Sequence, residues 1–314
     1  MATSDSPLSV PNITLAVARQ AGSGGGGSAG PFEPDLSLPA GNIVSDGFES
    51  GDLSAAGYPD FDWTEMRFTS LVTMSPSGNP TVIYNGSSIY NELVGDPRDW
   101  TALNGENSMR FAFNEGTDTN VFAEQRWRLV GRSEKTLWMR FAMRVPLNYI
   151  HENVPDIYGE SYSPTPNNKL FFIWMDSYTG TGAKVGMEFR PDGAGGSNFY
   201  LKTIGVGNGG DRGSVPFITY PDDQGRHMYL AVKVVTESTP GASDGSVEVW
   251  RKWAESGSVW QKTHELLGEP FNLPTDGSFP GWSFGYLMGA DNSGYAEQTE
   301  FLIDDFNLST ASLL

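Results

Sequence analysis

The chain has 314 residues, of which 38 are acidic and 20 are basic, so its formal net charge is −18. This charge argues against nucleic-acid backbones and anionic membranes as partners, because both repel an acidic surface. The absence of cysteine excludes disulfides, thiolate metal sites and cysteine nucleophiles. With 38 glycines, 20 prolines and 18 phenylalanines, the composition favours an all-β chain with many turns and an aromatic core.

Residues 1–42 are expected to form an extended N-terminal arm. The apolar run of residues 13–18 is interrupted by Thr14 and follows no basic start, so we expect no signal peptide. Residues 21–30, AGSGGGGSAG, are typical of a flexible linker, either natural or engineered. The proline-rich segment 31–40 is expected to be extended. No stretch reaches the ~20 apolar residues of a membrane helix, so we expect a soluble protein without membrane insertion.

Residues 43–314 are predicted to form one all-β domain. Residues 137–145 alternate with the period of two of a half-buried strand. The run 169–175, KLFFIWM, is continuously apolar after its first residue, as in a strand buried on both faces. No segment predicts an amphipathic helix longer than two turns. We therefore expect two packed antiparallel sheets, a jelly roll. The other predicted strands lie near residues 66–74, 81–84, 109–113, 121–130, 185–189, 199–204, 227–235, 247–253, 259–264, 282–288 and 301–308.

Five segments occur in a suggestive order: DGFESGDLS at 46–54, GRSEKTLWMRFAMRVP at 131–146, NNKLFFIWMD at 167–176, DGSVEVWRKW at 244–253 and EFLIDDFNLS at 300–309. Together they resemble the concanavalin A-like lectin/glucanase jelly roll, in its polysaccharide-lyase and laminin-G-like branches. The resemblance covers most of residues 46–309 and implies a β-sandwich. Because such folds serve lectins, hydrolases, lyases and structural modules, it leaves the function open.

The catalytic motifs of the enzymes in that superfamily are absent. Retaining glucanases carry Glu-x-Asp-x-x-Glu, whereas Glu297, Glu300 and Asp304 have the wrong spacing. The alginate-lyase branch carries Gln-x-His opposite Tyr-Lys-x-Gly-x-Tyr, and the segment 286–289, YLMG, lacks the lysine. These absences favour a function without catalysis.

Residues 147–166 and the strand before them hold the remaining catalytic candidates. A lyase needs a base, an acid and a cation for the uronate carboxylate. His151 is the candidate base, and Tyr149 or Tyr158 is the candidate acid. Arg140 or Arg144 is the candidate cation. The alternative is a surface loop with ordinary aromatic anchors.

A glycan-binding face is predicted on the polar side of strand 137–145. Trp138, Arg140 and Arg144 share that side, and Trp174 is a further candidate. Rings stack on the C–H faces of sugars, and planar polar groups bind hydroxyls. The alternative is that these tryptophans are largely buried.

A structural calcium site is the one cofactor that the resemblance implies. Calcium takes six to eight oxygen ligands, and the first and last strands of such sandwiches pair. Glu49 and Asp52 are then expected to approach Asp304 or Asp305. Because neighbouring strand residues point to opposite faces, only one of the last two is expected to be a ligand. The alternative is an edge of solvated acids.

A flexible arm followed by a β-sandwich, without a secretion signal, fits a protein docked on a larger particle. We expect a non-enzymatic virion-surface module, such as a capsid-decoration, head-fibre or tail-associated phage protein. Residues 1–30 would anchor it, lysis would release it, and its sandwich would face solvent and bind glycans. Two alternatives stay open: a polysaccharide lyase or glycanase that acts on an acidic glycan, and a free soluble lectin.

Overall fold

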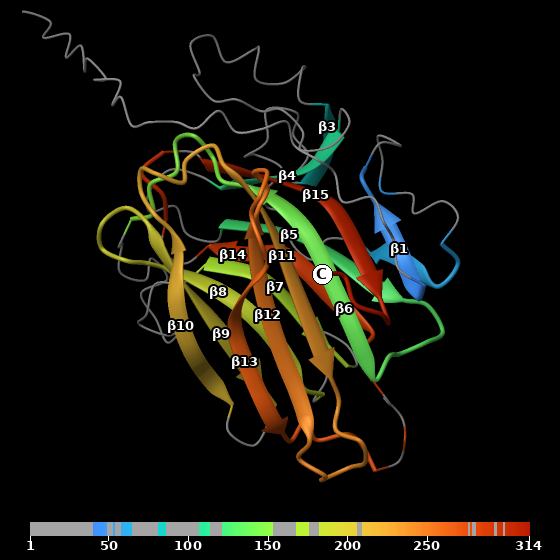
Figure 1. Ribbon diagram of the computed structural model, residues 1–314. Helices are drawn as coiled ribbons and strands as arrows, with labels where there is room; N and C mark the ends of the chain where they lie inside the picture. The colour runs from blue at the N-terminus through green and yellow to red at the C-terminus, as the bar shows by residue number, and fades with distance from the viewer. Residues whose placement is uncertain are drawn as a thin grey trace, which may run out of the picture.

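The computed structural model describes residues 40–48, 53, 58–64, 81–85, 107–113, 121–152, 168–175, 182–205, 209–275, 277, 281–291, 294–297 and 299–314. These residues form fifteen strands, and no helix occurs among them (Figure 1). The all-β prediction is therefore confirmed for the described part of the chain. None of the described segments is an apolar helix of the length that a bilayer crossing requires.

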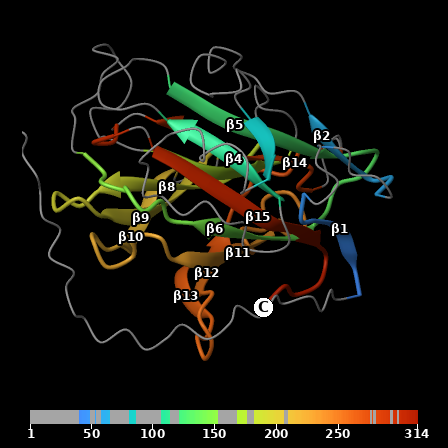
Figure 2. The ribbon, with the colours of Figure 1, turned by 90° about the horizontal axis from the view of Figure 1, so that it is seen from above.

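The strands form two antiparallel sheets. Sheet A has the order β13 (Gln261–Glu269), β12 (Gly245–Trp253), β11 (His227–Val235), β6 (Thr136–Arg144), β15 (Thr299–Ser309), β4 (Asn107–Phe113) and β3 (Thr81–Asn85), and β1 (Asn42–Asp46) also pairs with β15. Figure 2 shows β1 beside the end of β15.

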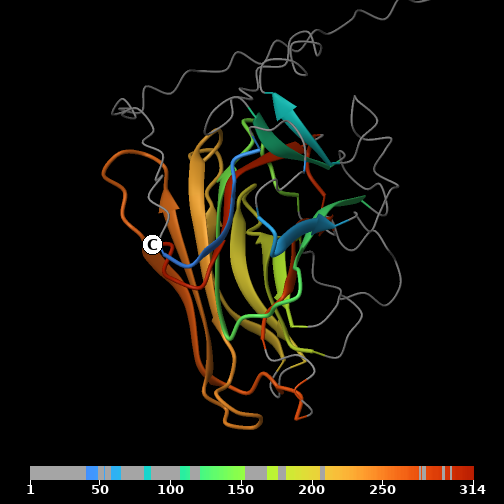
Figure 3. The ribbon, with the colours of Figure 1, turned by 90° about the vertical axis from the view of Figure 1, so that its right-hand side faces the viewer.

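Sheet B packs against sheet A. Its order is β10 (Gly210–Ile218), β9 (Ser197–Ile204), β8 (Lys184–Pro191), β7 (Asn168–Trp174), β14 (Phe284–Asp291), β5 (Val121–Leu129) and β2 (Phe61–Thr64). Seen edge-on, the orange strands of sheet A and the yellow strands of sheet B form two layers (Figure 3). The predicted antiparallel sandwich is confirmed.

The core lies between the inner faces of the sheets and is rich in aromatic rings. Side chains alternate across a strand, so every second residue of β6 points inward. Phe301 of β15 is fully buried and has its ring centre 5.9 Å from that of Phe189 and 6.0 Å from that of Phe113. Tyr149 and Tyr295 complete this cluster, each with its ring centre 5.9 Å from that of Phe301. Aromatic packing thus joins β15 and β4 of sheet A to β8 of sheet B.

Three described strands, β1, β2 and β10, were not predicted from the sequence. β2 has only four residues, and β10 contains Gly210, Gly213 and Pro216, whose composition suggests a loop. Proline is tolerated in β10 because this strand forms the edge of sheet B, where one side of the backbone needs no ladder partner. The predicted strand at residues 66–74 lies outside the described residues.

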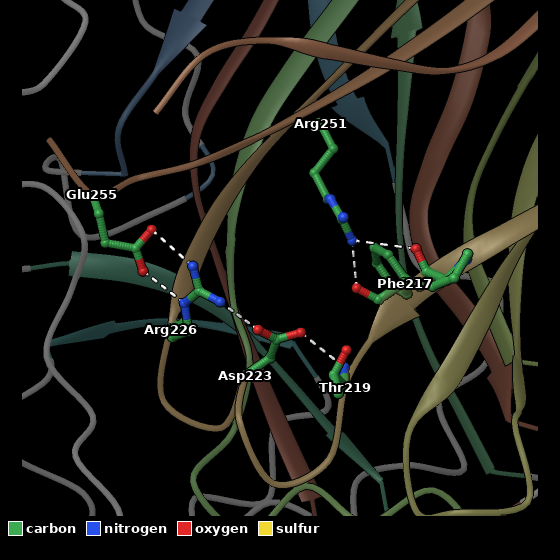
Figure 4. Close-up of polar contacts among 7 residues, drawn as sticks. Phe217, Thr219, Asp223, Arg226, Arg251 and Glu255 are labelled. Atoms are coloured by element: carbon green, nitrogen blue, oxygen red, sulfur yellow. Dashed lines mark hydrogen bonds and ion pairs between the residues drawn. The ribbon is translucent and has the colours of Figure 1, made fainter. Parts of the chain in front are cut away.

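Charged side chains fix the connection by which the chain passes from β10 in sheet B to β11 in sheet A (Figure 4). Asp223 accepts the backbone N–H of Thr219 at 2.8 Å and pairs with Arg226. Arg226 also binds both carboxylate oxygens of Glu255, at 2.7 and 3.1 Å. Arg251 of β12 donates to the carbonyl of Phe217. These contacts tie the crossover to strand β12 and the turn that follows it.

The aromatic cluster around Phe301 predicts a large effect of truncation. Phe301→Ala should lower the free energy of unfolding by about 3–5 kcal/mol, because it leaves a cavity in a packed core. Leu267→Ala is the control, since Leu267 is 67% exposed and surface changes stay within about 0.5 kcal/mol. Urea unfolding followed by tryptophan fluorescence measures both. Equal effects would show that the cluster is not packed as described.

Candidate functional site

A hollow of about 250 Å³ lies on the outer face of sheet B, over strands β7, β8, β9 and β14. It is lined by three aromatic side chains, by four charged ones and by Ile204. Concave sites that combine rings with a few polar groups are the usual places for small-molecule binding. We therefore take it as the candidate functional site.

The aromatic side of the hollow comes from β7 and β14. Phe172 and Trp174 are two residues apart on β7, so both point away from the core. Tyr286 of β14 is the cross-strand partner of Phe172, and their ring centres are 5.6 Å apart. Trp174 meets Tyr286 edge-on at 5.5 Å and stacks parallel to Phe284 at 6.5 Å. The four rings form a continuous apolar cluster, in which only Phe284 is more than 5% exposed.

A glycine lets the ring of Phe172 lie against the sheet. Gly186 of β8 is directly opposite Phe172 across the strand pair. A Cβ atom at position 186 would overlap the ring atoms of Phe172. The missing side chain therefore makes room for the ring at the floor of the hollow.

The charged side of the hollow centres on Glu188 of β8, which is fully buried. Its Oε1 atom accepts the ammonium of Lys169 at 2.5 Å and lies 3.2 Å from that of Lys202. Its Oε2 atom lies 3.3 Å from Arg190. Burial by itself raises the pKa of Glu188, but Lys169 and Lys202 outweigh it and hold that pKa below its ordinary value. The carboxylate is therefore ionised at neutral pH.

Arg190 extends the charged side toward β10. Its guanidinium binds Asp211 at 2.9 Å and lies 4.1 Å from the ring centre of Tyr200. Lys184 adds another cation at the opposite end of β8. Among the described residues, three lysines and one arginine thus surround two carboxylates, an excess of positive charge in a chain of net charge −18.

Two predicted catalytic residues lie in the core. His151 is 2% exposed, and its ring stacks on Tyr295 at 5.3 Å. The hydroxyl of Tyr149 lies 3.2 Å from Nδ1 of His151 and 3.0 Å from the hydroxyl of Ser197. Burial lowers the pKa of His151 to about 3, so its imidazole is neutral. Both side chains are sealed away from the hollow, and Tyr158 lies outside the described residues.

Three of the predicted glycan-binding residues lie on the outer face of sheet A and are buried there. Trp138 stacks on Trp250 at 5.2 Å, and Arg140 donates to the carbonyl of Leu313 at 3.2 Å. The C-terminal residues lie over β6 (Figure 1). Arg140 and Arg144 are each 3% exposed. Trp174 belongs to the other sheet, so the structure does not bring it to Trp138, and only Trp174 lines the hollow.

The described part of the predicted calcium site is Asp304 and Asp305, because Glu49 and Asp52 lie outside the described residues. Asp304 accepts the amide of Asp305 at 2.7 Å and the hydroxyl of Ser108 at 3.3 Å. Asp305 accepts the hydroxyl of Tyr229 at 3.2 Å. No group of three or more side chains suited to a metal occurs among the described residues. Calcium therefore stays a prediction.

The side-chain alternation from which we expected only one of these two aspartates to be a ligand does not hold between them. The pairing of β15 with β6 shifts register between Asp304 and Asn307, and Asp305 has a φ of 52°. Such a bulge interrupts the alternation of side chains. Both aspartates therefore reach polar partners of sheet A.

The sequence carried one overlooked signal for the charged side of the hollow. In the segment 184–190, KVGMEFR, polar residues and glycine alternate with apolar residues, which places Lys184, Glu188 and Arg190 on one face. No such alternation places Lys169 on this face, because the register of β7 and β8 shifts between Lys169 and Phe171. Only the pairing of strands brings it beside Glu188.

No protein-family model matches the chain, and no curated protein matches it in sequence. Among solved structures, an alginate lyase Aly36B mutant in complex with alginate tetrasaccharide is similar, with a TM-score of 0.43, 10% identity, and coverage of 75% of this chain and 98% of that one. A β-1,3-glucanase from Mycobacterium marinum has a TM-score of 0.42 and 11% identity over 87% of this chain and 99% of its own.

The β-glucanase of Bacillus licheniformis has a TM-score of 0.40 and 13% identity, and the match covers 88% of this chain and all of that one. At such TM-scores the similarity carries no argument about a site.

The burial of His151 predicts a dependence of stability on pH. Its pKa in the fold, about 3, lies below the ordinary 6.5, so the unfolded chain binds the proton first. The neutral imidazole makes its full contribution to the free energy of unfolding above pH 6.5. This contribution falls by about 2 kcal/mol when the pH is lowered to 5. His151→Gln should remove this component. The stability difference between wild type and variant should be constant from pH 7 to 8 and shrink below pH 6.5 in urea unfolding. A constant difference down to pH 5 would mean that the folded protein can protonate His151.

Proposed function

We propose that the protein binds an acidic oligosaccharide in the hollow of sheet B. The observation that carries this proposal is the set of cations Lys169, Lys184 and Lys202, which are partly exposed around a hollow with a floor of buried aromatic rings. Ammonium groups form strong hydrogen bonds with carboxylates. The excess of positive charge favours a ligand that carries acidic groups over a neutral one.

Binding fits the hollow better than cleavage does. A glycosidase uses two carboxyl groups on either side of the bond, about 5–5.5 Å apart in retaining enzymes and about 6.5–9.5 Å in inverting enzymes. Among the described residues that line the hollow, Glu188 is the one carboxylate, and cations hold both its oxygens. A lyase that used His151 as its base would need that buried side chain to reach solvent.

The arm supports a further part of this proposal from sequence alone. Residues 1–30 would anchor the sandwich to a larger assembly such as a virion surface, and lysis would bring it outside the cell. The hollow would then face solvent and meet glycans of a host or its surroundings. A structural calcium ion near β1 and β15 remains compatible with this arrangement.

Calorimetry with tetrasaccharides of galacturonate, glucuronate, mannuronate and neutral glucose tests the binding proposal. Lys202→Ala should weaken uronate binding about 10-fold or more, because a hydrogen bond to a charged group contributes ~1.5–3 kcal/mol. It should leave binding of any neutral tetrasaccharide nearly unchanged. Lys262→Ala is the matched control, since Lys262 is 38% exposed on the other sheet. Equal losses in the two variants, or no uronate binding by wild type, would contradict the proposal.

Phe172→Leu tests the aromatic floor in the same assay. The variant keeps apolar bulk but removes the flat ring. We expect roughly 2- to 10-fold weaker binding, which corresponds to the ~0.5–1.5 kcal/mol of an aromatic contact. Absorbance of unsaturated uronates, recorded on the same mixtures, detects cleavage. An increase in this absorbance would show that the protein cleaves uronates as a lyase and does not only bind them.

Deletion of residues 1–30 tests the anchor. The truncated chain should keep the melting temperature and tryptophan fluorescence of the sandwich, because these residues precede the first described strand. Sedimentation with purified particles from the source culture should recover the full chain and leave the truncated chain in the supernatant. Equal sedimentation of both would show that the anchor lies elsewhere.

A further inference from the structure

Glu188 lies at the meeting point of three cations and has no exposed surface. Lys169 on β7 is its cross-strand partner, and Lys202 reaches it from β9. Both ammonium groups approach the same oxygen atom, Oε1, while Arg190 approaches Oε2. A fully buried carboxylate between cations from three strands fixes where those cations stand.

Two ammonium groups at one oxygen repel each other, and the carboxylate between them offsets this repulsion. Burial lowers the pKa of Lys169, and the charge of Glu188 opposes that effect. Among the described residues, Lys202, Arg190 and, more weakly, Asp211 also act on Lys169. Tyr286 lies beside it in the hollow. Without Glu188, the charge that raises the pKa of Lys169 would be lost, and Lys169 would lose its proton more readily.

Both lysines of this cluster are partly exposed. The side chain of Lys202 is 24% exposed and that of Lys169 is 19% exposed. An ammonium has three donors, so one contact with Glu188 does not use up the donors of Lys202. Both lysines also line the hollow next to the ring of Phe172. An acidic sugar in the hollow would carry its carboxylate within their reach.

We propose that Glu188 is a positioning residue, which holds Lys169 and Lys202 side by side and charged so that the pair recognises the carboxylate of an acidic sugar. The proposal rests on the proposed function of the hollow. In this proposal a buried carboxylate orders the cations of an anion-binding site, although its own negative charge repels the ligand. Glu188 sets both the position and the protonation of the cations.

The test compares wild type with Glu188→Gln and Asp211→Asn, using the uronate tetrasaccharide that binds most tightly in the panel. Asp211→Asn is the matched control, because it removes a carboxylate of the same network that pairs with Arg190 rather than with the lysines. Calorimetry at pH 6, 7.5 and 9 gives the affinity. Glu188→Gln should bind about 10-fold more weakly at pH 7.5. The loss should be smallest at pH 6 and largest at pH 9, because Lys169 deprotonates as the pH rises.

A second variant keeps the test decisive if the buried charge of Lys169 unfolds Glu188→Gln. Glu188→Gln combined with Lys169→Met removes both charges and retains the volume. It should bind weakly, with an affinity that follows the pH dependence of the wild type. Melting temperatures confirm that each variant is folded.

The outcomes separate this proposal from the proposed function. If wild type binds no uronate tetrasaccharide, the function itself is wrong. If wild type binds and Glu188→Gln matches it at every pH, or loses affinity equally at every pH, Glu188 does not position the lysines. A loss that grows with pH in Glu188→Gln alone supports the proposal.

Discussion

The site depends on one strand that is apolar on both faces. The inner face of β7 contributes Phe171 and Ile173 to the core between the sheets. Its outer face carries Phe172 and Trp174, which are nearly as well buried although they belong to no inter-sheet core. Burial of apolar area stabilises both faces. The same strand therefore holds the sandwich together and supplies the floor of the hollow.

The charges of the hollow follow from that floor. Lys169, Glu188 and Lys202 stand on three neighbouring strands beside the rings, where water is partly excluded. A charge in such surroundings is costly unless it is paired. The described partners of Glu188 are all cations, so the described residues around the hollow carry a positive excess while the chain as a whole is acidic. Under the proposed function, this contrast between local and total charge would favour acidic ligands, which the composition does not reveal.

The polar residues on the outer faces of the two sheets differ in their exposure to solvent. On the outer face of sheet A, Arg110 and Glu300 form a bidentate pair that is almost completely buried. Arg140 and Asp304 there are also covered and bonded to the protein. On the outer face of sheet B, the lysines stay partly exposed. Polar residues on an outer face therefore mark a site only where the fold leaves them accessible.

The sequence by itself determined the class of fold, because alternation with a period of two and the apolar run 169–175 require strands packed in layers. It did not locate the hollow. His151 has the chemistry of a base, but the tertiary structure places it among Tyr149, Phe189 and Tyr295. Conversely, Lys169, Glu188 and Lys202 are far apart in the chain and carry no joint motif. Strand order and register bring them together, because hydrogen bonding between strands depends on the whole sheet, whereas alternation depends only on neighbouring residues.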